Sequence, residues 1–188
     1  MTDPVVGGRP EPWSVPVVLH EPDPTWPASA EQEVRTIRHA LGPLSLAADH
    51  VGSTSVPGLA AKPVLDLLLQ VPDSADEAAY VPPLVALGYW LQVREPDWLE
   101  HRVLYRRTAR GSPWAVNLHV LSPGLGSSEI ARMLTFRDWL RSHPQDRDRY
   151  AAVKRELAAR PWRYVQDYAD AKSEVVEDIL DRAAQERR

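Results

Sequence analysis

The stretch that decides the fold runs His50-Val-Gly-Ser-Thr-Ser-Val-Pro-Gly58 and leads into Val64-Leu-Asp-Leu-Leu-Leu-Gln-Val71. The second part is apolar on both faces of a β-strand apart from one aspartate, which is typical of a central strand covered on each side. Residues 46–51 are also strand-like, so the part rich in glycine and hydroxyl groups connects two strands. Its two glycines and three hydroxyl groups can offer N–H and O–H donors to an anion. The alternative is an ordinary tight turn.

Asp66 is the one charged residue of this central strand. Burying an unpaired carboxylate is costly, so Asp66 needs a cation, hydrogen-bond donors or a metal ion as its partner. A later strand carries Asn117 and His119 on one face, because alternate residues of a strand share a face. If the two strands are neighbours, Asp66 and His119 can meet. The simpler alternative is a buried Asp–His pair with no catalytic function.

The spacing of apolar residues outward from this segment predicts the other elements. A β-like stretch at 15–19 and a helix at 30–41 precede it, and a helix from Ser74 to near Gly88 follows it. Both helices begin with a capping box, formed by Ser29 with Gln32 and by Ser74 with Glu77. Three strands and three helices complete the chain, at about 89–93, 101–107, 114–121, 128–142, 145–160 and 163–186. This order predicts an α+β fold, with one domain over residues 15–186 after a loose arm at 1–14.

The composition of the chain excludes several classes of protein. Its 188 residues include no cysteine, which rules out disulfides and thiolate metal sites. The formal net charge of -4 gives no electrostatic reason to bind nucleic acid or an anionic membrane. The first residues lack the basic and apolar parts of a signal peptide, and the longest apolar run is too short to span a bilayer. We therefore expect a cytoplasmic protein with no membrane association, and nucleic-acid binding is disfavoured.

Basic side chains recur on the apolar faces of the three C-terminal helices. Only three lysines occur beside 19 arginines, so each lysine is the more informative residue. Helical spacing places Arg137, Lys154 and Lys172 on the apolar stripes of successive helices. One such cation usually extends along the edge of the core to reach water. Three of them predict a shared, inward-facing basic cluster, whose natural counter-charge is a phosphate-bearing ligand or the Asp66 carboxylate.

The run from His50 to Asp66 resembles the signature of the GrpB family. The resemblance covers roughly residues 14–183 and is supported by several further motifs: Glu21-Pro-Asp-Pro-Thr-Trp26, His101-Arg102, Asn117-Leu-His119-Val and Phe136-Arg-Asp-Trp-Leu-Arg141. It implies a nucleotidyltransferase-like fold, in which a mixed β-sheet is flanked by helices and the C-terminal part is helical.

The resemblance also implies a site, although the site is incomplete. Nucleotidyltransferases carry Gly-Ser on a turn, an acid-x-acid pair on the next strand and a third carboxylate on a later strand. Gly52-Ser53 and Asp66 match the first two features, whereas Leu68 stands in place of the second acid, and Asn117 or His119 stands near the third. Because phosphoryl transfer with two metal ions needs several carboxylates, the sequence leaves open whether the protein is an active transferase that uses Mg²⁺.

Two functions remain as hypotheses. The first is the transfer or binding of a nucleotide or another phosphorylated small molecule, with Asp66 and His119 as catalytic residues and Asp66 as the ligand of a single metal ion. Phosphate would be held by Gly52, Ser53, Thr54, Ser55, Lys62, Arg102, Arg137, Lys154 and Lys172. The alternative is a non-catalytic ligand-binding or partner module, similar to the folding accessory domain fused to dephospho-coenzyme A kinase in some bacteria. Such a module would act in trans on a protein partner, because the chain has no kinase P-loop motif.

Overall fold

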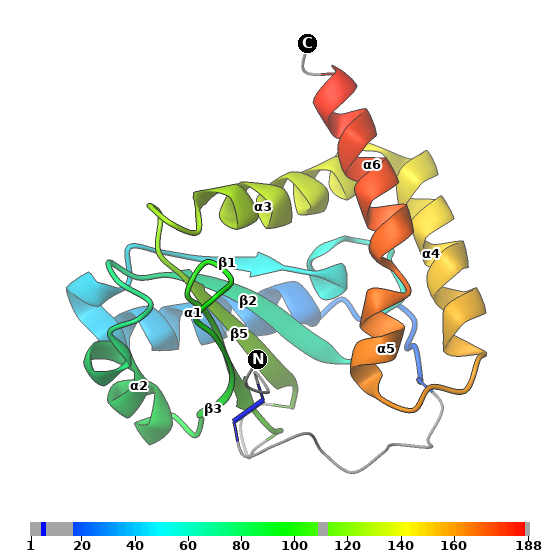
Figure 1. The fold of residues 1–188 in the computed structure, drawn as a ribbon. Coiled ribbons are helices and arrows are strands. Elements are labelled where there is room, and N and C mark those ends of the chain that lie inside the picture. Colours follow the sequence, from blue (N-terminus) through cyan, green and yellow to red (C-terminus); the bar gives the residue numbers. More distant parts are fainter. Residues whose placement is uncertain (1–4, 7–16, 109–112, 187–188) are drawn as a thin grey trace.

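The computed structural model describes residues 5–6, 17–108 and 113–186, and its centre is a five-stranded β-sheet (Figure 1). The strand order is β1-β2-β5-β4-β3, and β2 and β5 are parallel whereas the other neighbouring pairs are antiparallel. The strands are β1 (Ala47–Val51), β2 (Val64–Gln70), β3 (Trp90–Glu95), β4 (His101–Arg106) and β5 (Ala115–Leu121). The helices are α1 (Trp26–Leu41), α2 (Glu77–Ala86), α3 (Ser127–Ser142), α4 (Pro144–Ala158), α5 (Val165–Asp170) and α6 (Ser173–Glu186).

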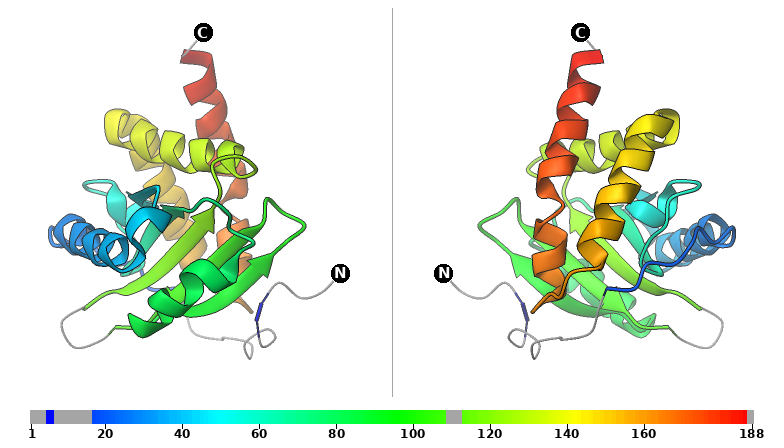
Figure 2. Two further views of the ribbon diagram at one scale, coloured as in Figure 1. Left: turned by 90° about the vertical axis from the view of Figure 1, so that its left-hand side faces the viewer. Right: turned by 90° about the vertical axis from the view of Figure 1, so that its right-hand side faces the viewer.

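The sheet separates two layers of helices, which confirms the predicted α+β class with a mixed sheet. Helices α1 and α2 pack on one face over the largest core cluster, which contains Leu67, Leu69 and Leu118. Helix α3 covers β1 on the other face, and α4 and α6 pack beside it (Figure 2). The run of leucines in β2 is apolar on both faces because both layers of helices need an apolar partner.

The parallel pairing of β2 with β5 fixes which polar residues share a face. Asp66 lies opposite Asn117, and Leu68 lies opposite His119. Val51 of β1 is the partner of Asp66 on the other side. Asp66, Asn117 and His119 therefore all lie on the face that α3 to α6 cover, as the alternation along each strand predicts.

The predicted starts of the first two helices are wrong. Helix α1 begins at Trp26 rather than at residue 30, because Pro27 fits in the first turn, where no N–H partner is needed. Ser29 thus lies inside the helix. Helix α2 begins at Glu77 without a side-chain cap, and the N–H of the buried Ser74 instead donates to Ser122 Oγ at 2.7 Å.

The predicted helix at 163–186 is two helices, α5 and α6, separated by a turn at Ala171 and Lys172. No glycine or proline marks this break in the sequence. Lys172 consequently lies in a turn and not on a helical stripe, and the turn brings its side chain against the ring of Tyr168, with Nζ 4.7 Å from the ring centroid.

Most of the predicted arm at 1–14 lies outside the described residues. Val5 forms an isolated antiparallel bridge to Val93 of β3, and the Val6 N–H donates to the Gln92 carbonyl at 2.9 Å. The β-like stretch at 15–19 is described from residue 17, where it has no regular structure. Among the described residues, no helix has the length and apolar character needed to cross a membrane.

Candidate functional site

The glycine at the start of the loop makes room for the aspartate of the central strand. Gly52 follows β1 with φ of +67°, a conformation that favours glycine. A Cβ atom at this position would lie 2.3 Å from Asp66 Oδ2. The other carboxylate oxygen, Oδ1, accepts a hydrogen bond of 2.8 Å from Asn117 Nδ2. The turn and the two central strands therefore position one carboxylate between them.

The three hydroxyl groups of the loop have different partners. Residues Ser53–Ser55 form a short 3-10 turn, in which Ser55 Oγ donates to the Gly52 carbonyl at 2.6 Å. Thr54 Oγ1 lies 2.9 Å from His50 Nε2. Both side chains are buried and fix the shape of the turn. Ser53 is different, because its Oγ accepts a hydrogen bond of 2.9 Å from Lys154 Nζ.

All three lysines of the chain gather around this turn and Asp66, and we call Lys62, Lys154 and Lys172 the lysine cluster. Lys154 is only 2% exposed, and its Nζ also donates to the Ala60 carbonyl at 2.5 Å. Lys62 Nζ and Lys172 Nζ lie 5.7 and 4.7 Å from the centroid of the Tyr168 ring. The predicted cluster of Arg137, Lys154 and Lys172 is thus found only in part: Lys154 and Lys172 converge, the latter from a turn, whereas Arg137 pairs with Asp49.

Burial and mutual repulsion weaken proton binding in the lysine cluster. Burial, followed by the charge of Lys172, lowers the pKa of Lys154 to about 7, and the negative charge of Asp66 opposes this shift. Burial, followed by the charge of Lys62, lowers the pKa of Lys172 to about 8. Burial also lowers the pKa of Lys62. Between pH 7 and pH 8 the amines of Lys154 and Lys172 are therefore close to the point where they change between the charged and neutral forms.

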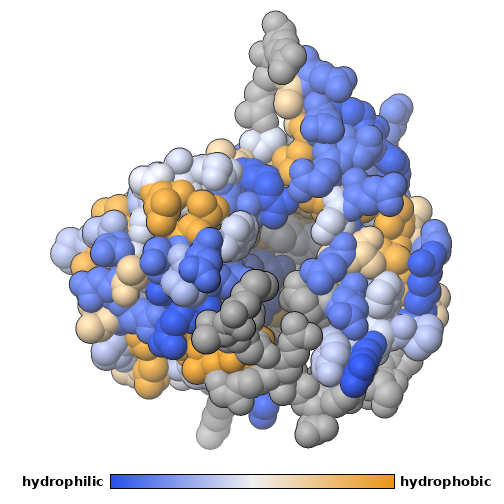
Figure 3. Space-filling view, viewed as in Figure 1, coloured by the Kyte–Doolittle hydropathy of each residue, from blue (hydrophilic) through white to orange (hydrophobic). Residues whose placement is uncertain are grey.

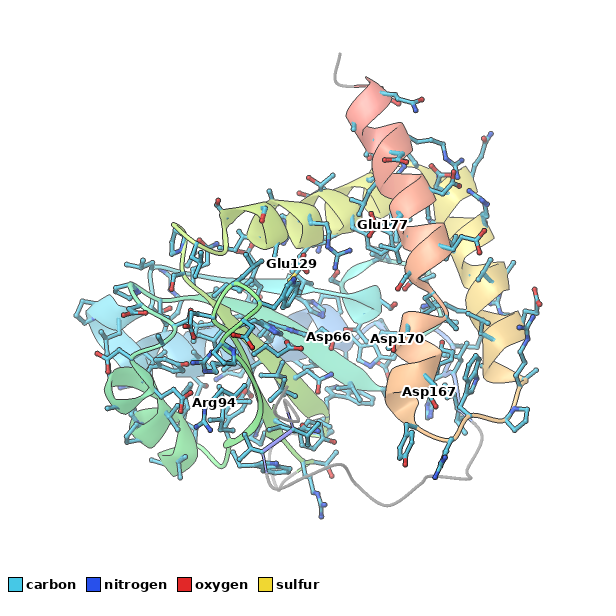
Figure 4. The ribbon with its side chains drawn as sticks, in the orientation of Figure 1. Asp66, Arg94, Glu129, Asp167, Asp170 and Glu177 are labelled. Atoms are coloured by element: carbon cyan, nitrogen blue, oxygen red, sulfur yellow. The ribbon has the colours of Figure 1, made fainter. Side chains whose placement is uncertain are left out.

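A pocket of about 450 Å³ opens beside the lysine cluster, between the β3–β4 turn and the C-terminal helices. Figure 3 shows a hollow between the part of the molecule that contains the sheet and the part built from α5 and α6. Figure 4 shows Asp66 and Glu129 lying at this hollow, with Glu177 on α6 above it. Lys172 belongs both to the lysine cluster and to the pocket wall, which is formed by Trp98, Glu129, Arg132, Tyr150, Ala169, Lys172, Ser173, Val176 and Glu177.

The two predicted catalytic residues do not hydrogen bond to each other. The strands are neighbours as expected, but the register places Asn117, not His119, opposite Asp66. His119 Nδ1 instead lies 3.1 Å from His101 Nε2, and His101 Nδ1 lies 2.7 Å from Glu95 Oε2. Burial lowers the pKa of each histidine to about 4, so both rings are neutral at pH 7.

Two of the predicted phosphate ligands are held elsewhere. Arg102 lies on the opposite face of the sheet from Asp66, where its Nε donates to Glu77 Oε1 of α2 at 2.6 Å. Arg137 of α3 donates to Asp49 Oδ1 at 3.1 Å and to the His50 carbonyl at 3.2 Å. The hydrogen bonds of Arg102 thus link α2 to the sheet, and those of Arg137 link α3 to β1.

The residues around Asp66 do not fit a two-metal centre of the nucleotidyltransferase type. Strands β2 and β5 carry no carboxylate besides Asp66, because Leu68 and Asn117 occupy the other two places. The Asn117 amide donates its hydrogen to Asp66. Among the described residues, no group of three or more histidine, cysteine, aspartate or glutamate side chains is arranged to hold a metal ion. Metal binding by Asp66 therefore stays an untested prediction.

Comparison with known proteins identifies the family. The family model described as GrpB protein matches residues 16–182. The chain belongs to the GrpB family. It is 54% identical to the UPF0157 protein BH1888 of Halalkalibacterium halodurans over 95% of this chain and 88% of that protein. The crystal structure of conserved protein GrpB from Enterococcus faecalis matches with a TM-score of 0.67 and 26% identity, over 87% of this chain and 99% of that chain.

A longer relative contains a similar segment. A protein named dephospho-CoA kinase from Mycolicibacterium paratuberculosis is 34% identical over 89% of this chain, and the match covers 46% of that protein. This GrpB chain thus spans about half the length of that kinase.

Several residues of the site were missed in the sequence analysis. Tyr150, Tyr168 and Glu129 read as ordinary helix positions. Only the packing of α3 to α6 brings Tyr150 and Glu129 to the pocket and Tyr168 to the lysine cluster. Glu95 and His101 come together with His119 because β3, β4 and β5 lie side by side. The His101-Arg102 pair, noted above for its resemblance to the family, was the one available signal for this part of the site.

Proposed function

We propose that this GrpB protein binds a phosphorylated small molecule, either a nucleotide or a phosphorylated metabolite, in the pocket beside the lysine cluster. The observation that carries the proposal is an excess of positive charge: Asp66 acts on all three lysines, and the one further carboxylate among the described residues that acts on the cluster is Asp170, beside Lys172. A phosphate group supplies the missing negative charge and several acceptors for the ammonium donors. In this proposal the ammonium group of Lys172 contacts the phosphate, since Lys172 belongs to both the lysine cluster and the pocket wall.

The ligand would be held by amines and not through a resident pair of metal ions. A two-metal transferase needs carboxylates that β2 and β5 do not carry. The proposal is therefore binding without a need for Mg²⁺, and transfer of a nucleotidyl or phosphoryl group is the less supported form of the same hypothesis. Gly52 and Ser53 position Asp66 and Lys154 in this proposal.

Calorimetry with nucleoside triphosphates and phosphorylated metabolites, with and without Mg²⁺, tests the proposal. We expect binding in the absence of Mg²⁺, and a loss of at least about tenfold in affinity for Lys172→Met, as one charge-assisted contact is worth roughly 1.5–3 kcal/mol. Arg35→Met is the matched control, because Arg35 is an exposed cation of α1 that pairs with Glu31 away from the pocket. Equal affinity for the wild type and Lys172→Met would contradict the proposal. Binding that requires Mg²⁺ and disappears in Asp66→Ala would favour the metal-assisted transferase.

Proton uptake gives a second, independent test. An anion beside the lysine cluster favours the charged amines, so binding near pH 7.5 should raise the pKa of Lys154 and Lys172 and take up protons. Calorimetry in buffers of different ionisation enthalpy measures this uptake. Affinity should fall as pH rises above about 7 to 8, where the free protein loses these protons. An affinity independent of pH from 6.5 to 9 would argue against lysine contacts.

A second candidate function is that of a partner module. It is favoured by the similarity of this chain to about half of a protein named dephospho-CoA kinase. In this form, a separate kinase polypeptide would be the partner of the chain. Sedimentation of the chain with a dephospho-CoA kinase that lacks such a segment tests the idea, and independent sedimentation of the two proteins at micromolar concentrations would reject it.

A further inference from the structure

The hydrogen-bonded row Glu95–His101–His119 crosses three strands and lies beside two residues of the pocket wall, Trp98 and Glu129. The three residues come from the neighbouring strands β3, β4 and β5 and lie on the same face as Asp66. The two histidine rings are nearly parallel, with an interplanar angle of 14° and centroids 5.3 Å apart. Two groups of the pocket wall border the row: the Trp98 ring lies 5.0 Å from that of His101, and the charge of Glu129 acts on both histidines.

The direction of the hydrogen bonds follows from the chemistry of the first residue. An ionised Glu95 can only accept, so His101 Nδ1 must donate to it. The His101 ring is neutral, and its Nε2 is then the acceptor that His119 Nδ1–H requires. The same rule leaves His119 Nε2 without a proton. Within the described part of the chain this nitrogen makes no hydrogen bond, and the half-buried ring leaves it accessible.

We propose that His119 Nε2 is a proton acceptor for a ligand hydroxyl and that His101 and Glu95 carry the proton away from the pocket. In this step the hydroxyl O–H bond breaks, its electron pair stays on oxygen, and an Nε2–H bond forms on His119. The Nδ1 proton of His119 passes to His101 Nε2, and the Nδ1 proton of His101 passes to Glu95. The side chain of Glu95 is 32% exposed and can return the proton to water.

His119 is the catalytic residue of this proposal, and His101 and Glu95 are positioning residues that also relay the proton. The activity differs from anion binding by the lysine cluster and does not depend on it. A ligand that carries both a phosphate and a hydroxyl group would use both features, because the two are near enough for the charge of Asp66 to act on each.

The tautomer of His119 tests the proposal without a known substrate. Nitrogen-15 NMR of histidine-labelled protein at pH 7 should show the proton of His119 on Nδ1, with Nε2 unprotonated. Glu95→Ala removes the acceptor that orients the row, so a substantial fraction of His119 should change to the Nε2–H tautomer. Asp97→Ala is the matched control, since Asp97 is an exposed carboxylate of the same β3–β4 turn and is not part of the row.

Each result bears on the proposal. Nε2–H as the main tautomer in the wild type would overturn it, because that state arises if Glu95 holds the proton and every bond in the row is reversed. An unchanged tautomer in Glu95→Ala would remove Glu95 and His101 from the mechanism. If Glu95→Ala does not fold, His101→Phe is the substitute, because it removes the hydrogen-bond partner of His119 Nδ1 and should change the tautomer in the same way.

Chemical modification tests whether His119 can be reached from solution. Treatment of the wild type with diethyl pyrocarbonate, followed by peptide mapping, should show carbethoxylation of His119. A completely inert His119 would show that Nε2 is not available to a ligand.

Discussion

At the scale of single residues, Gly52 is the position where the fold and the candidate site depend on each other most directly. Its φ of +67° is combined with a space that the Asp66 carboxylate already fills. Gly52→Ala should therefore lower the free energy of unfolding by roughly 2–4 kcal/mol, the sum of a strained backbone and an overpacked contact. Urea unfolding measures this change.

Gly42→Ala separates the two causes. Gly42 also has a positive φ, of +55°, but no atom lies within 4 Å of a Cβ placed there. The free energy of unfolding of Gly42→Ala should fall by only about 1 kcal/mol, which is the cost of the backbone conformation alone. Equal losses for the two variants would mean that the contact with Asp66 contributes nothing.

Lys172 illustrates how a binding residue can reduce stability. In the absence of an anion its ammonium group is half-buried and close to the charge of Lys62, which is why its pKa is lowered to about 8. Lys172→Met should therefore increase the free energy of unfolding at pH 7, by on the order of 1 kcal/mol, while it weakens phosphate binding. Thermal unfolding in phosphate-free buffer measures the first effect. A Lys172→Met protein that is less stable than the wild type would show that the lysine has a structural role.

At the scale of elements, Arg102 holds α2 against the sheet. It donates to Glu77 at 2.6 Å, and Arg94 donates to the same carboxylate, so one acidic residue of α2 is shared by two strands. Arg102→Met should cost roughly 1.5–3 kcal/mol of stability, the range for a hydrogen bond to a charged group, and should leave phosphate affinity unchanged. The exposed pair of Arg35 with Glu31 is the comparison, and its loss should cost less than about 1 kcal/mol. A loss of phosphate affinity in Arg102→Met would restore its predicted function as a ligand.

The helices and strands also show which features of the structure could be predicted from the sequence. Strands β1 to β5 and helices α3 and α4 were predicted within a few residues, because alternation and helical spacing are local signals. The break between α5 and α6 was not, since no glycine or proline produces it. The Gly-Ser turn, Asp66 and the lysines were predicted as one site from residue chemistry together with the family resemblance, but that site also included Arg102 and Arg137, which pair elsewhere. The row from Glu95 to His119 was not, because it depends on strand order and register, which spacing does not determine.

At the scale of the whole molecule, buried bases should make stability rise with pH over a wide range. Burial lowers the pKa of His50, His101 and His119 to about 4, and of Lys154 and Lys172 to about 7 and about 8. In the unfolded chain the same groups titrate near 6.5 and about 10.4. Between the folded and unfolded values the unfolded chain holds more protons, so the free energy of unfolding increases with pH in both windows.

Urea unfolding from pH 5 to pH 9.5 in zwitterionic buffers tests this expectation. The wild type should become steadily more stable across the range. The double variant Lys154→Met/Lys172→Met should lose most of the increase above pH 7, apart from the contribution of Lys62, and keep the increase below it. A wild-type stability that falls between pH 7 and pH 9 would contradict the lowered lysine pKa values.

The pairing of β2 with β5 has a consequence for how the chain reaches this structure. The two central strands are parallel, and the hydrogen bond between Asp66 and Asn117 joins residues 51 positions apart. The leucines of β2 therefore cannot be fully covered until α2, β3 and β4 have been synthesised and β5 has emerged. Closing such a distant contact is slow compared with forming a hairpin. During synthesis the β1–β2 hairpin is thus the segment most exposed to aggregation, and folding speed should respond most strongly to substitutions at the β2–β5 seam.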